Sequence, residues 1–476
     1  MKKAHWRIVI VILMSVIVSL LLRSFFLIDY LNYSLNSDQA NKLVLSYAKS
    51  IELPAYYEYQ NRHQAKGSNS WVSATAKLAR TTPSYAIALA QYFQVAQQHE
   101  QAEYWYLQAI SLGNTAANYA LAQMFFTQQR YEKASQLLSK DSRLGWETSS
   151  FKALKLAIEL ALINGNIENA QKLSDFLKQS YAYDPLAKAL TYELAYFGVA
   201  SSKPSPNIMS TNCVASVQMF ATNLDDLRYV QQLIDQINQH PLAEFVCFSS
   251  PRYISMDELA CQHWEDDVIQ CREDIWQQHE STISTRFIGV LLPQGGANVN
   301  HGIMYLDRQD TFAVFIHELT HLLGFIDEYP LPTNHAKCLS AQSQSFSHNI
   351  AVLEPIYYGE RETLREQVLR HLAWGSKIEK QTPIFMQYHE GWKLGTPPKY
   401  QGEIGVFLSN TCAGERGFSD NTGRSLQAVK PISQMTQLEY FEMPLPKQYI
   451  DMLRENPNKY LMPSFHTNIQ NAQMMR

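Results

Sequence analysis

The chain has 476 residues, enough for two or more domains of about 100–200 residues each. Its hydrophobic content of 46% is ordinary for a globular protein. Its net charge of −4 provides no basic field for nucleic acid, so we exclude nucleic-acid binding as the main function.

The first residues predict an uncleaved membrane anchor over residues 1–30. Three basic residues precede an apolar run over residues 8–22, which residues 25–28 extend. The stretch of about 21 residues is close to the roughly 20 that span a bilayer. No small-x-small cleavage site follows, although a cleaved signal peptide stays the alternative. The basic flank predicts a single-pass protein of a bacterial inner membrane, with a cytoplasmic N-terminus and an extracytoplasmic catalytic domain.

Residues 38–200 form a second region, which repeats. The sequence ALAQYF at residues 88–93 returns as ALAQMF at residues 120–125, and a looser third copy covers residues 160–170. A period in the low-to-mid thirties is typical of helical solenoids, so we expect an α-helical repeat region. The segment resembles tetratricopeptide and Sel1-like repeats. A surface for a protein partner and a spacer are equally compatible with it.

The polar, Pro-rich residues 201–206 predict a linker, so a third domain is expected over residues 207–476. A helix is predicted over residues 224–238 and strands over residues 243–248 and 286–292. Helices that alternate with strands predict a mixed α/β domain. The expected fold class is therefore α plus α/β: a transmembrane helix, an α-helical solenoid and a mixed α/β domain.

All the cysteines lie in this third domain. None forms a C-x-x-C pair, which disfavours a Cys-based zinc site or a thioredoxin-like motif. An even number in an exported domain predicts three disulfides, and six reduced buried thiols are the alternative. Cys261 and Cys271 are the easiest local pair. The six are Cys213, Cys247, Cys261, Cys271, Cys338 and Cys412.

One segment, HELTHLLGFID, begins at His317 and carries the chemistry. His317 and His321 are four residues apart, so on a helix they share one face and can bind one metal ion. Glu318 is placed to act as a general base on a metal-bound water. Gly324 is expected to end the helix in a left-handed conformation, so that Asp327 returns as a third ligand.

The flanking residues predict the helix itself. Asp310 is the expected N-cap. Apolar residues then recur at helical spacing and predict a buried stripe: Phe312, Phe315, Ile316, Leu319 and Leu323. The alternative is a buried amphipathic helix whose histidines pair with carboxylates.

The motif resembles the metzincin zinc peptidases whose third ligand is Asp. Asp327-Glu328-Tyr329 also resembles the IgA-peptidase-like members of that group. The resemblance covers the motif and, more weakly, residues 285–440. It implies a zinc ion (Zn²⁺) bound by His317, His321 and Asp327. IgA-peptidase-like motifs differ by about one residue in spacing, which leaves Glu328 as the alternative third ligand.

The resemblance also implies two supporting features. One is an edge strand just upstream of the motif helix, expected at residues 301–306, to which an extended peptide adds by backbone hydrogen bonds. The other is a methionine turn beneath the metal. Met435, which follows Lys430-Pro431, is the favoured candidate, and Met386 is the rival.

The predicted function is a membrane-anchored zinc-dependent metallopeptidase. It would hydrolyse peptide bonds with zinc-activated water and with Glu318 as the general base. The expected partners are a protein or peptide substrate, a protein bound to the repeats and the membrane, but no nucleic acid. Two alternatives stay open: a helical-repeat adaptor with a catalytically silent zinc domain, and a zinc hydrolase acting on cell-wall peptides.

Overall fold

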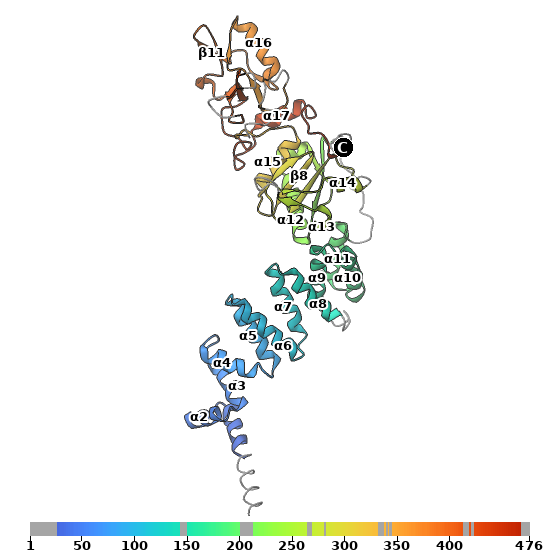
Figure 1. The fold of residues 1–476 in the computed structure, drawn as a ribbon, viewed down its shortest axis with the longest axis vertical. Coiled ribbons are helices and arrows are strands. Elements are labelled where there is room, and N and C mark those ends of the chain that lie inside the picture. Colours follow the sequence, from blue (N-terminus) through green and yellow to red (C-terminus); the bar gives the residue numbers. More distant parts are fainter. Residues whose placement is uncertain are drawn as a thin grey trace, which may run out of the picture. The chain divides into compact units, whose positions relative to one another are not determined.

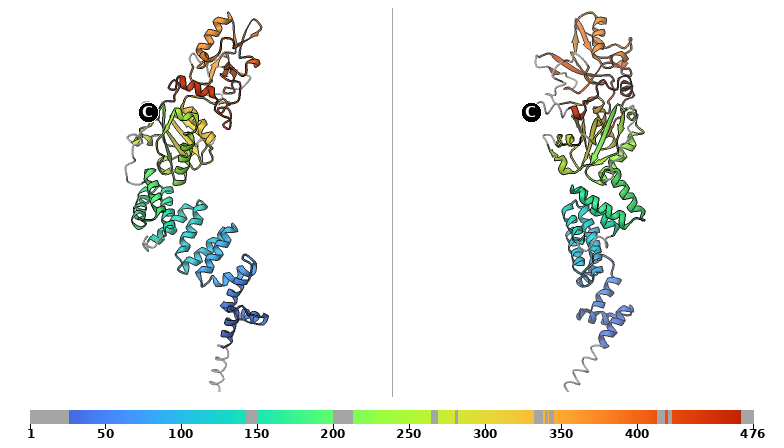
Figure 2. Two further views of the ribbon diagram at one scale, coloured as in Figure 1. Left: turned by 180° about the vertical axis from the view of Figure 1, so that it is seen from behind. Right: turned by 90° about the vertical axis from the view of Figure 1, so that its right-hand side faces the viewer.

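The computed structural model describes residues 26–142, 150–199, 213–263, 269–279, 282–331, 338, 341, 345–412, 418–419 and 423–467. The chain divides into two compact units, residues 1–160 and 161–476, and each is described by itself. Figures 1 and 2 show helices through the first unit, and helices together with strands in the second. The predicted linker at residues 201–206 lies outside the described residues.

The transmembrane helix in the predicted fold class is wrong, since no helix among the described residues is long and apolar enough to cross a membrane. Crossing takes about 20 apolar residues. By comparison, α10 (Ile167–Ser180) and α12 (Leu224–Ile237) have 14 residues each. The same finding contradicts the predicted single-pass membrane location. The apolar run over residues 8–22 lies outside the described residues.

The first unit is built from short helices, each of which packs against the next from α2 to α8. A helix over residues 26–36 precedes them. The others are α2 (Lys42–Ser50), α3 (Pro54–His63), α4 (Asn69–Leu78), α5 (Pro83–Val95), α6 (His99–Ser111), α7 (Ala116–Thr127), α8 (Tyr131–Ser142) and α9 (Phe151–Ile163), which continues into the second unit.

The sequence repeat is also a structural repeat. Leu89 in α5 and Leu121 in α7 are both fully buried, and so is the small residue Ala102 of α6. The turn inside each helix pair has its left-handed residue at the same place, Gln97 and Gln129, each with φ of 59°. The helix pair α5–α6 and the helix pair α7–α8 thus bury residues at matching places in their sequences. The repeat in sequence corresponds to a repeated packing unit.

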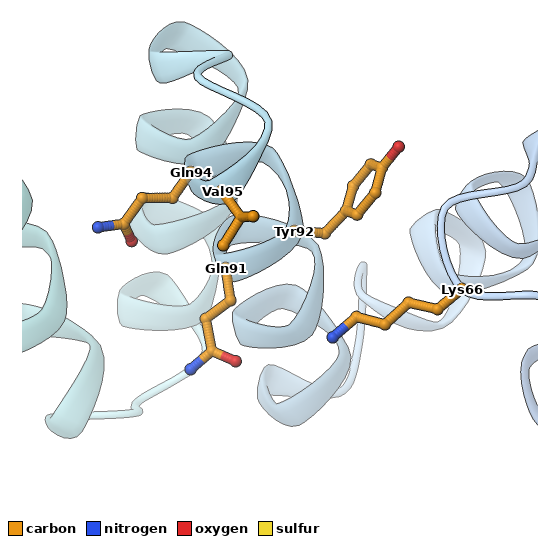
Figure 3. Close-up of a pocket in the computed structure, with 5 residues that line it drawn as sticks. All are labelled: Lys66, Gln91, Tyr92, Gln94 and Val95. Carbon is orange, nitrogen blue, oxygen red and sulfur yellow. The ribbon is translucent and has the colours of Figure 1, made fainter.

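An open groove lies on the repeat helices (Figure 3). Its volume is about 630 Å³. Lys66 extends from the segment between α3 and α4 toward the face of α5 that carries Gln91 and Tyr92. Val95, at the end of α5, also lines the groove and is 84% exposed.

The second unit contains a mixed sheet with strand order β2-β1-β6-β8-β7, and β3 also pairs with β1. All of these pairs are parallel except that of β7 with β8. The strands are β1 (Ala215–Ala221), β2 (Val246–Phe248), β3 (Arg252–Tyr253), β6 (Phe287–Leu292), β7 (Asn298–Asn300) and β8 (Ile303–Asp307).

Two helices pack on this sheet: α12 contacts β1 and β6, and α15 (Phe312–Leu322) contacts β7 and β8. The predicted helix over residues 224–238 and strand over residues 286–292 are confirmed as α12 and β6. The edge strand predicted at residues 301–306 is wrong. That segment forms β8, which is buried between β6 and β7, and the short strand β7 is the edge.

The rest of the second unit has short elements. Three further sheets among the described residues have the orders β10-β12-β11, β13-β15-β14 with β9 also paired to β15, and β4-β5. The strands are β4 (Gln262–His263), β5 (Ile269–Gln270), β9 (Ala351–Leu353), β10 (Ile356–Tyr357), β11 (Phe385–Tyr388), β12 (Gly391–Leu394), β13 (Phe407–Leu408), β14 (Phe418–Ser419) and β15 (Ser425–Lys430). The helices are α11 (Pro185–Tyr196), α13 (Met256–Leu259), α14 (Ile275–Gln278), α16 (Arg361–His371) and α17 (Lys447–Glu455), with 3₁₀ turns η2 (Pro241–Glu244), η6 (Gly375–Lys377) and η7 (Pro398–Tyr400).

Three disulfides are present, as the cysteine count predicts. They join Cys213 to Cys247, Cys261 to Cys271, and Cys338 to Cys412. The first ties the residues before β1 to β2, its neighbour in the sheet. The third has both cysteines in a small core beside β9 and β15.

The end of α9, helix α11 and the residue after α11 bond directly to the α/β part of the second unit. The Arg228 guanidinium of α12 donates to both carboxylate oxygens of Glu193 in α11, at 2.6 and 2.7 Å. The Tyr253 hydroxyl of β3 donates to the carbonyl of Leu162 at 2.7 Å, and its backbone N–H donates to the carbonyl of Phe197 at 3.0 Å. The last repeat helices therefore belong to the same compact unit as the sheet.

Candidate metal centre

The motif helix α15 is held deep in the second unit by its apolar face. Phe315, Leu319 and Leu322 have no exposed surface, and Ile316 has 1%. The side chain of Thr311 caps the helix by accepting from the N–H of Val314.

The N-cap prediction at Asp310 is therefore one residue out. The Oδ2 atom of Asp310 accepts instead from the N–H of Asp307 at 2.6 Å. Its carbonyl accepts from the Tyr229 hydroxyl at the same distance. Asp310 is thus committed to the turn between β8 and α15, which leaves the cap to the next residue.

The helix ends at a glycine that no other residue replaces without strain. Gly324 has φ of +91°, and a Cβ at this position would lie 2.2 Å from the carbonyl oxygen of Tyr460. Beyond it, the Asn349 side chain accepts from the N–H of Ile326 at 3.0 Å and donates to its carbonyl at 2.7 Å. The left-handed turn and the Asn349 clamp return the chain, so that Asp327 faces the helix again.

Three side-chain atoms converge at this return. The Oδ1 atom of Asp327 lies 3.0 Å from Nε2 of His317 and 3.2 Å from Nε2 of His321. The two Nε2 atoms are 3.2 Å apart. These separations are close to the roughly 3.3 Å between ligands that bind one zinc tetrahedrally with bonds of about 2.0–2.1 Å.

Both imidazoles are oriented by backbone carbonyls. Nδ1 of His317 lies 2.8 Å from the carbonyl oxygen of Gln437, and Nδ1 of His321 lies 3.2 Å from that of Phe325. A carbonyl can only accept, so each Nδ1 carries a proton and Nε2 is the nitrogen of each ring that faces the shared point. The buried Oδ1 of Asp327 makes no hydrogen bond of normal geometry among the described residues. Two imidazole nitrogens and an anionic oxygen thus face one another, an arrangement that a cation stabilises, whether it is a proton or a metal ion.

The electrostatics agree with an anionic pocket. Burial lowers the pKa of His321, but the Asp327 carboxylate more than offsets this and raises it to about 9. Burial raises the pKa of Asp327, but His321 and His317 more than offset this and hold it well below its usual range. In the metal-free protein, a proton on His321 therefore occupies the position that suits a cation.

Glu318 is buried beside the ligands, with 6% of its surface exposed. Burial raises its pKa, and the nearby carboxylates of Asp327 and Asp310 raise it further, against the opposing effect of the two histidines. A carboxyl group with a raised pKa can both accept and return a proton near neutral pH.

Tyr329 is the exposed neighbour of the centre. It is 41% exposed, and its ring lies nearly parallel to that of His317, with centroids 6.2 Å apart. Burial of its hydroxyl end raises its pKa, and the carboxylates of Asp327 and Glu318 add to the shift.

Glu328, the alternative third ligand, points into the protein and has no exposed surface. Its Oε2 accepts from Lys430 Nζ at 2.9 Å and from Thr436 Oγ1 at 2.8 Å. Its Oε1 accepts from Asn349 Nδ2 at 3.0 Å and from the Tyr449 hydroxyl. Of these partners the sequence analysis named only Lys430, as the basic residue that precedes Pro431 and the candidate methionine turn. A lysine at the end of the buried strand β15 is the signal that could have indicated a buried carboxylate.

The segment that contains Met435 lies against the site, but the methionine is not beneath it. Gln437 bonds to His317, and the carbonyl of Leu438 accepts from the N–H of Glu328 at 2.8 Å. Met435 itself is 52% exposed. The rival, Met386, lies in β11 and pairs with β12.

The structure thus brings together all three predicted metal ligands, His317, His321 and Asp327, as the group among the described residues that could hold a metal ion. Glu318 lies next to them, and Glu328 belongs to a separate buried network. No protein-family model matches the chain, and no curated protein sequence matches it.

Proposed function

We propose that this chain is a zinc-dependent metallopeptidase of the metzincin type. His317, His321 and Asp327 hold the zinc ion, and Glu318 moves protons. The observation that carries the proposal is the meeting of three ligand atoms 3.0–3.2 Å apart, with both imidazoles turned so that Nε2 points inward. Two nitrogens and one carboxylate oxygen are the donor set of many zinc sites that keep an open position for catalysis.

A zinc ion held there supplies a Lewis acid and lowers the pKa of water toward about 7. Glu318 accepts the proton of the attacking water and delivers it to the nitrogen of the leaving amine. Its burial and raised pKa suit both transfers, because the protonated form is not too costly to reach. The Nδ1 atoms of His317 and His321 face backbone carbonyl oxygens, so Nε2 of each ring is the nitrogen available to zinc.

A peptide substrate is favoured by the sheet edge next to the motif helix. Strand β7 ends the sheet order, runs antiparallel to β8 and contacts α15. An extended peptide that adds to such an edge by backbone hydrogen bonds lies across the end of the sheet where α15 begins.

Substitution of Glu318 tests the proposal. Glu318→Gln should retain zinc, because it leaves all three ligands, yet lose hydrolysis by about 10²–10⁴-fold as for removal of a general base. Glu362→Gln, an exposed carboxyl in α16, is the matched control and should behave as wild type. The measurements are zinc content by atomic emission and cleavage of an unfolded protein substrate. Full activity in Glu318→Gln, or a wild type that binds no zinc, would refute the proposed function.

A further inference from the structure

The residue that follows the third ligand is the centre of a buried charge network. Glu328 is fully buried, and its carboxylate is contacted by the side chains of Lys430, Thr436, Asn349 and Tyr449. A buried carboxylate is costly unless each oxygen finds donors, and here each oxygen has two. Glu328 is thus saturated and has no capacity left for a metal ion or a substrate.

The four donors come from three segments that are distant from Glu328 in the chain. Asn349 precedes β9, Lys430 ends β15, Thr436 lies in the turn after it, and Tyr449 lies in α17. Their sequence separations from Glu328 range from 21 to 121 residues. One side chain therefore cross-links the main segments that surround the metal centre.

The same segments hold the ligands. Asn349 binds both backbone groups of Ile326, and the turn that contains Thr436 also provides the Gln437 carbonyl that orients His317. The Thr411 hydroxyl donates to the carbonyl of Asp327 at 2.8 Å. By contrast, no hydrogen bond of normal geometry holds Oδ1 of Asp327 among the described residues. Its position depends on the backbone at residues 326–328.

We infer that Glu328 is a positioning residue of the metal centre. Its network with Lys430 fixes the backbone after Asp327, so that Oδ1 stays at the point shared by the two histidine Nε2 atoms. The inference rests on the proposed function, because it assigns a role toward the same metal. Groups that orient metal ligands without touching the metal commonly change metal affinity when they are altered.

Removal of the carboxylate charge should loosen the third ligand. In Glu328→Gln, Lys430 loses the negative charge of Glu328 and keeps only Glu439, at 2.8 Å, as an anionic partner, so that the chain after Asp327 is held less firmly. Zinc affinity, measured by competition with a chelator, should fall by about 10–100-fold. The visible absorption spectrum of the cobalt-substituted protein should change as well, because a displaced carboxylate alters the coordination geometry. If Glu328→Gln fails to fold, Tyr449→Phe removes a single hydroxyl from the same carboxylate and should shift both readouts in the same direction.

Two further variants separate positioning from stability. Glu193→Gln alters a carboxylate that accepts two hydrogen bonds from Arg228, at 2.6 and 2.7 Å, outside the ligand and Glu328 contacts, and should lower stability without changing zinc affinity. The double variant Glu328→Gln/Lys430→Met removes both charges. Lys430 also pairs with Glu439 at 2.8 Å, and the side chain of Glu439 is partly exposed, so water replaces Lys430 at that carboxylate in the double variant. The double variant should therefore be at least as stable as Glu328→Gln, while its zinc affinity stays weak.

The inference is overturned if Glu328→Gln binds zinc as tightly as wild type with an unchanged cobalt spectrum. It is also overturned if the double variant recovers zinc affinity together with stability, because the network would then serve the fold alone. Failure of the peptidase activity alone looks different: the wild type would bind zinc and cleave no peptide, whatever happens to the Glu328 variants. A wild type that binds no zinc would overturn both the proposed function and this inference.

Discussion

At the scale of single residues, the proposed zinc ligands His321 and Asp327 form an acid–base pair in the metal-free protein. The Asp327 carboxylate keeps His321 protonated in the metal-free protein, with a pKa of about 9. Zinc needs the lone pair of Nε2, so zinc and the proton compete for the same atom.

This competition predicts proton release. At pH 7, zinc binding should release about one proton, and the apparent affinity should rise as the pH increases toward about 9. Calorimetry in two buffers with different ionisation enthalpies measures the number of protons released. The same titration above pH 9.5 is the control, because His321 has by then lost its proton and the release should fade. Binding at pH 7 without proton release would contradict the assignment of His321.

Gly324 offers a second test at the same scale. Its left-handed backbone costs an alanine about 1–2 kcal/mol, and the new Cβ would also meet the Tyr460 carbonyl oxygen. Gly324→Ala should therefore lose about 2–5 kcal/mol of unfolding free energy and weaken zinc binding. Gly423 has a similar φ of +81° with open space around it, so Gly423→Ala isolates the backbone cost. Equal losses in the two variants, measured by urea unfolding, would show that the close approach of Tyr460 is unimportant.

At the scale of elements, the motif helix was predictable because its signals are local. The helical spacing of the apolar residues predicts α15, and the glycine predicts its end. The N-cap was misplaced because both Asp310 and Thr311 are good capping residues, and the Asp310 carboxylate accepts instead from the N–H of Asp307. Local patterns determine which segment is helical, but the exact end depends on which side chain the neighbouring turn already uses.

The sheet edge shows where local patterns fail. The three residues of β7 have no strand signature of their own, whereas β8 is a conspicuous apolar segment. Such an apolar strand suits an inner position, with partners on both sides. The Glu328 network was beyond prediction for a related reason: its partners lie up to 121 residues away, and nothing near Glu328 in the sequence indicates them.

At the scale of the whole molecule, the compact units divide the chain within α9, at residues 160 and 161. The domain boundary near residue 200 stays a prediction from composition. Helices α10 and α11 share their composition with the repeats, yet the chain from the end of α9 to the residue after α11 makes specific bonds to the sheet part through Leu162, Glu193 and Phe197. We therefore expect the metal centre to depend on part of the repeat region for stability.

Truncation tests this dependence. A chain that begins at residue 150 keeps α9 to α11 and should unfold in urea with the same zinc-dependent transition as the full chain. A chain that begins at residue 207 loses the carboxylate that binds Arg228 and both carbonyls that bind Tyr253. At about 1 kcal/mol for each hydrogen bond lost, its unfolding free energy should fall by at least ~2–4 kcal/mol.

In the full chain, Arg228→Met should reproduce part of this loss of unfolding free energy. Its control is Arg272→Met, which breaks only an exposed pair with Asp274 and should cost close to nothing. If the shorter chain were as stable as the longer one, α10 and α11 would belong to the repeats alone, and the metal-binding part would fold without them.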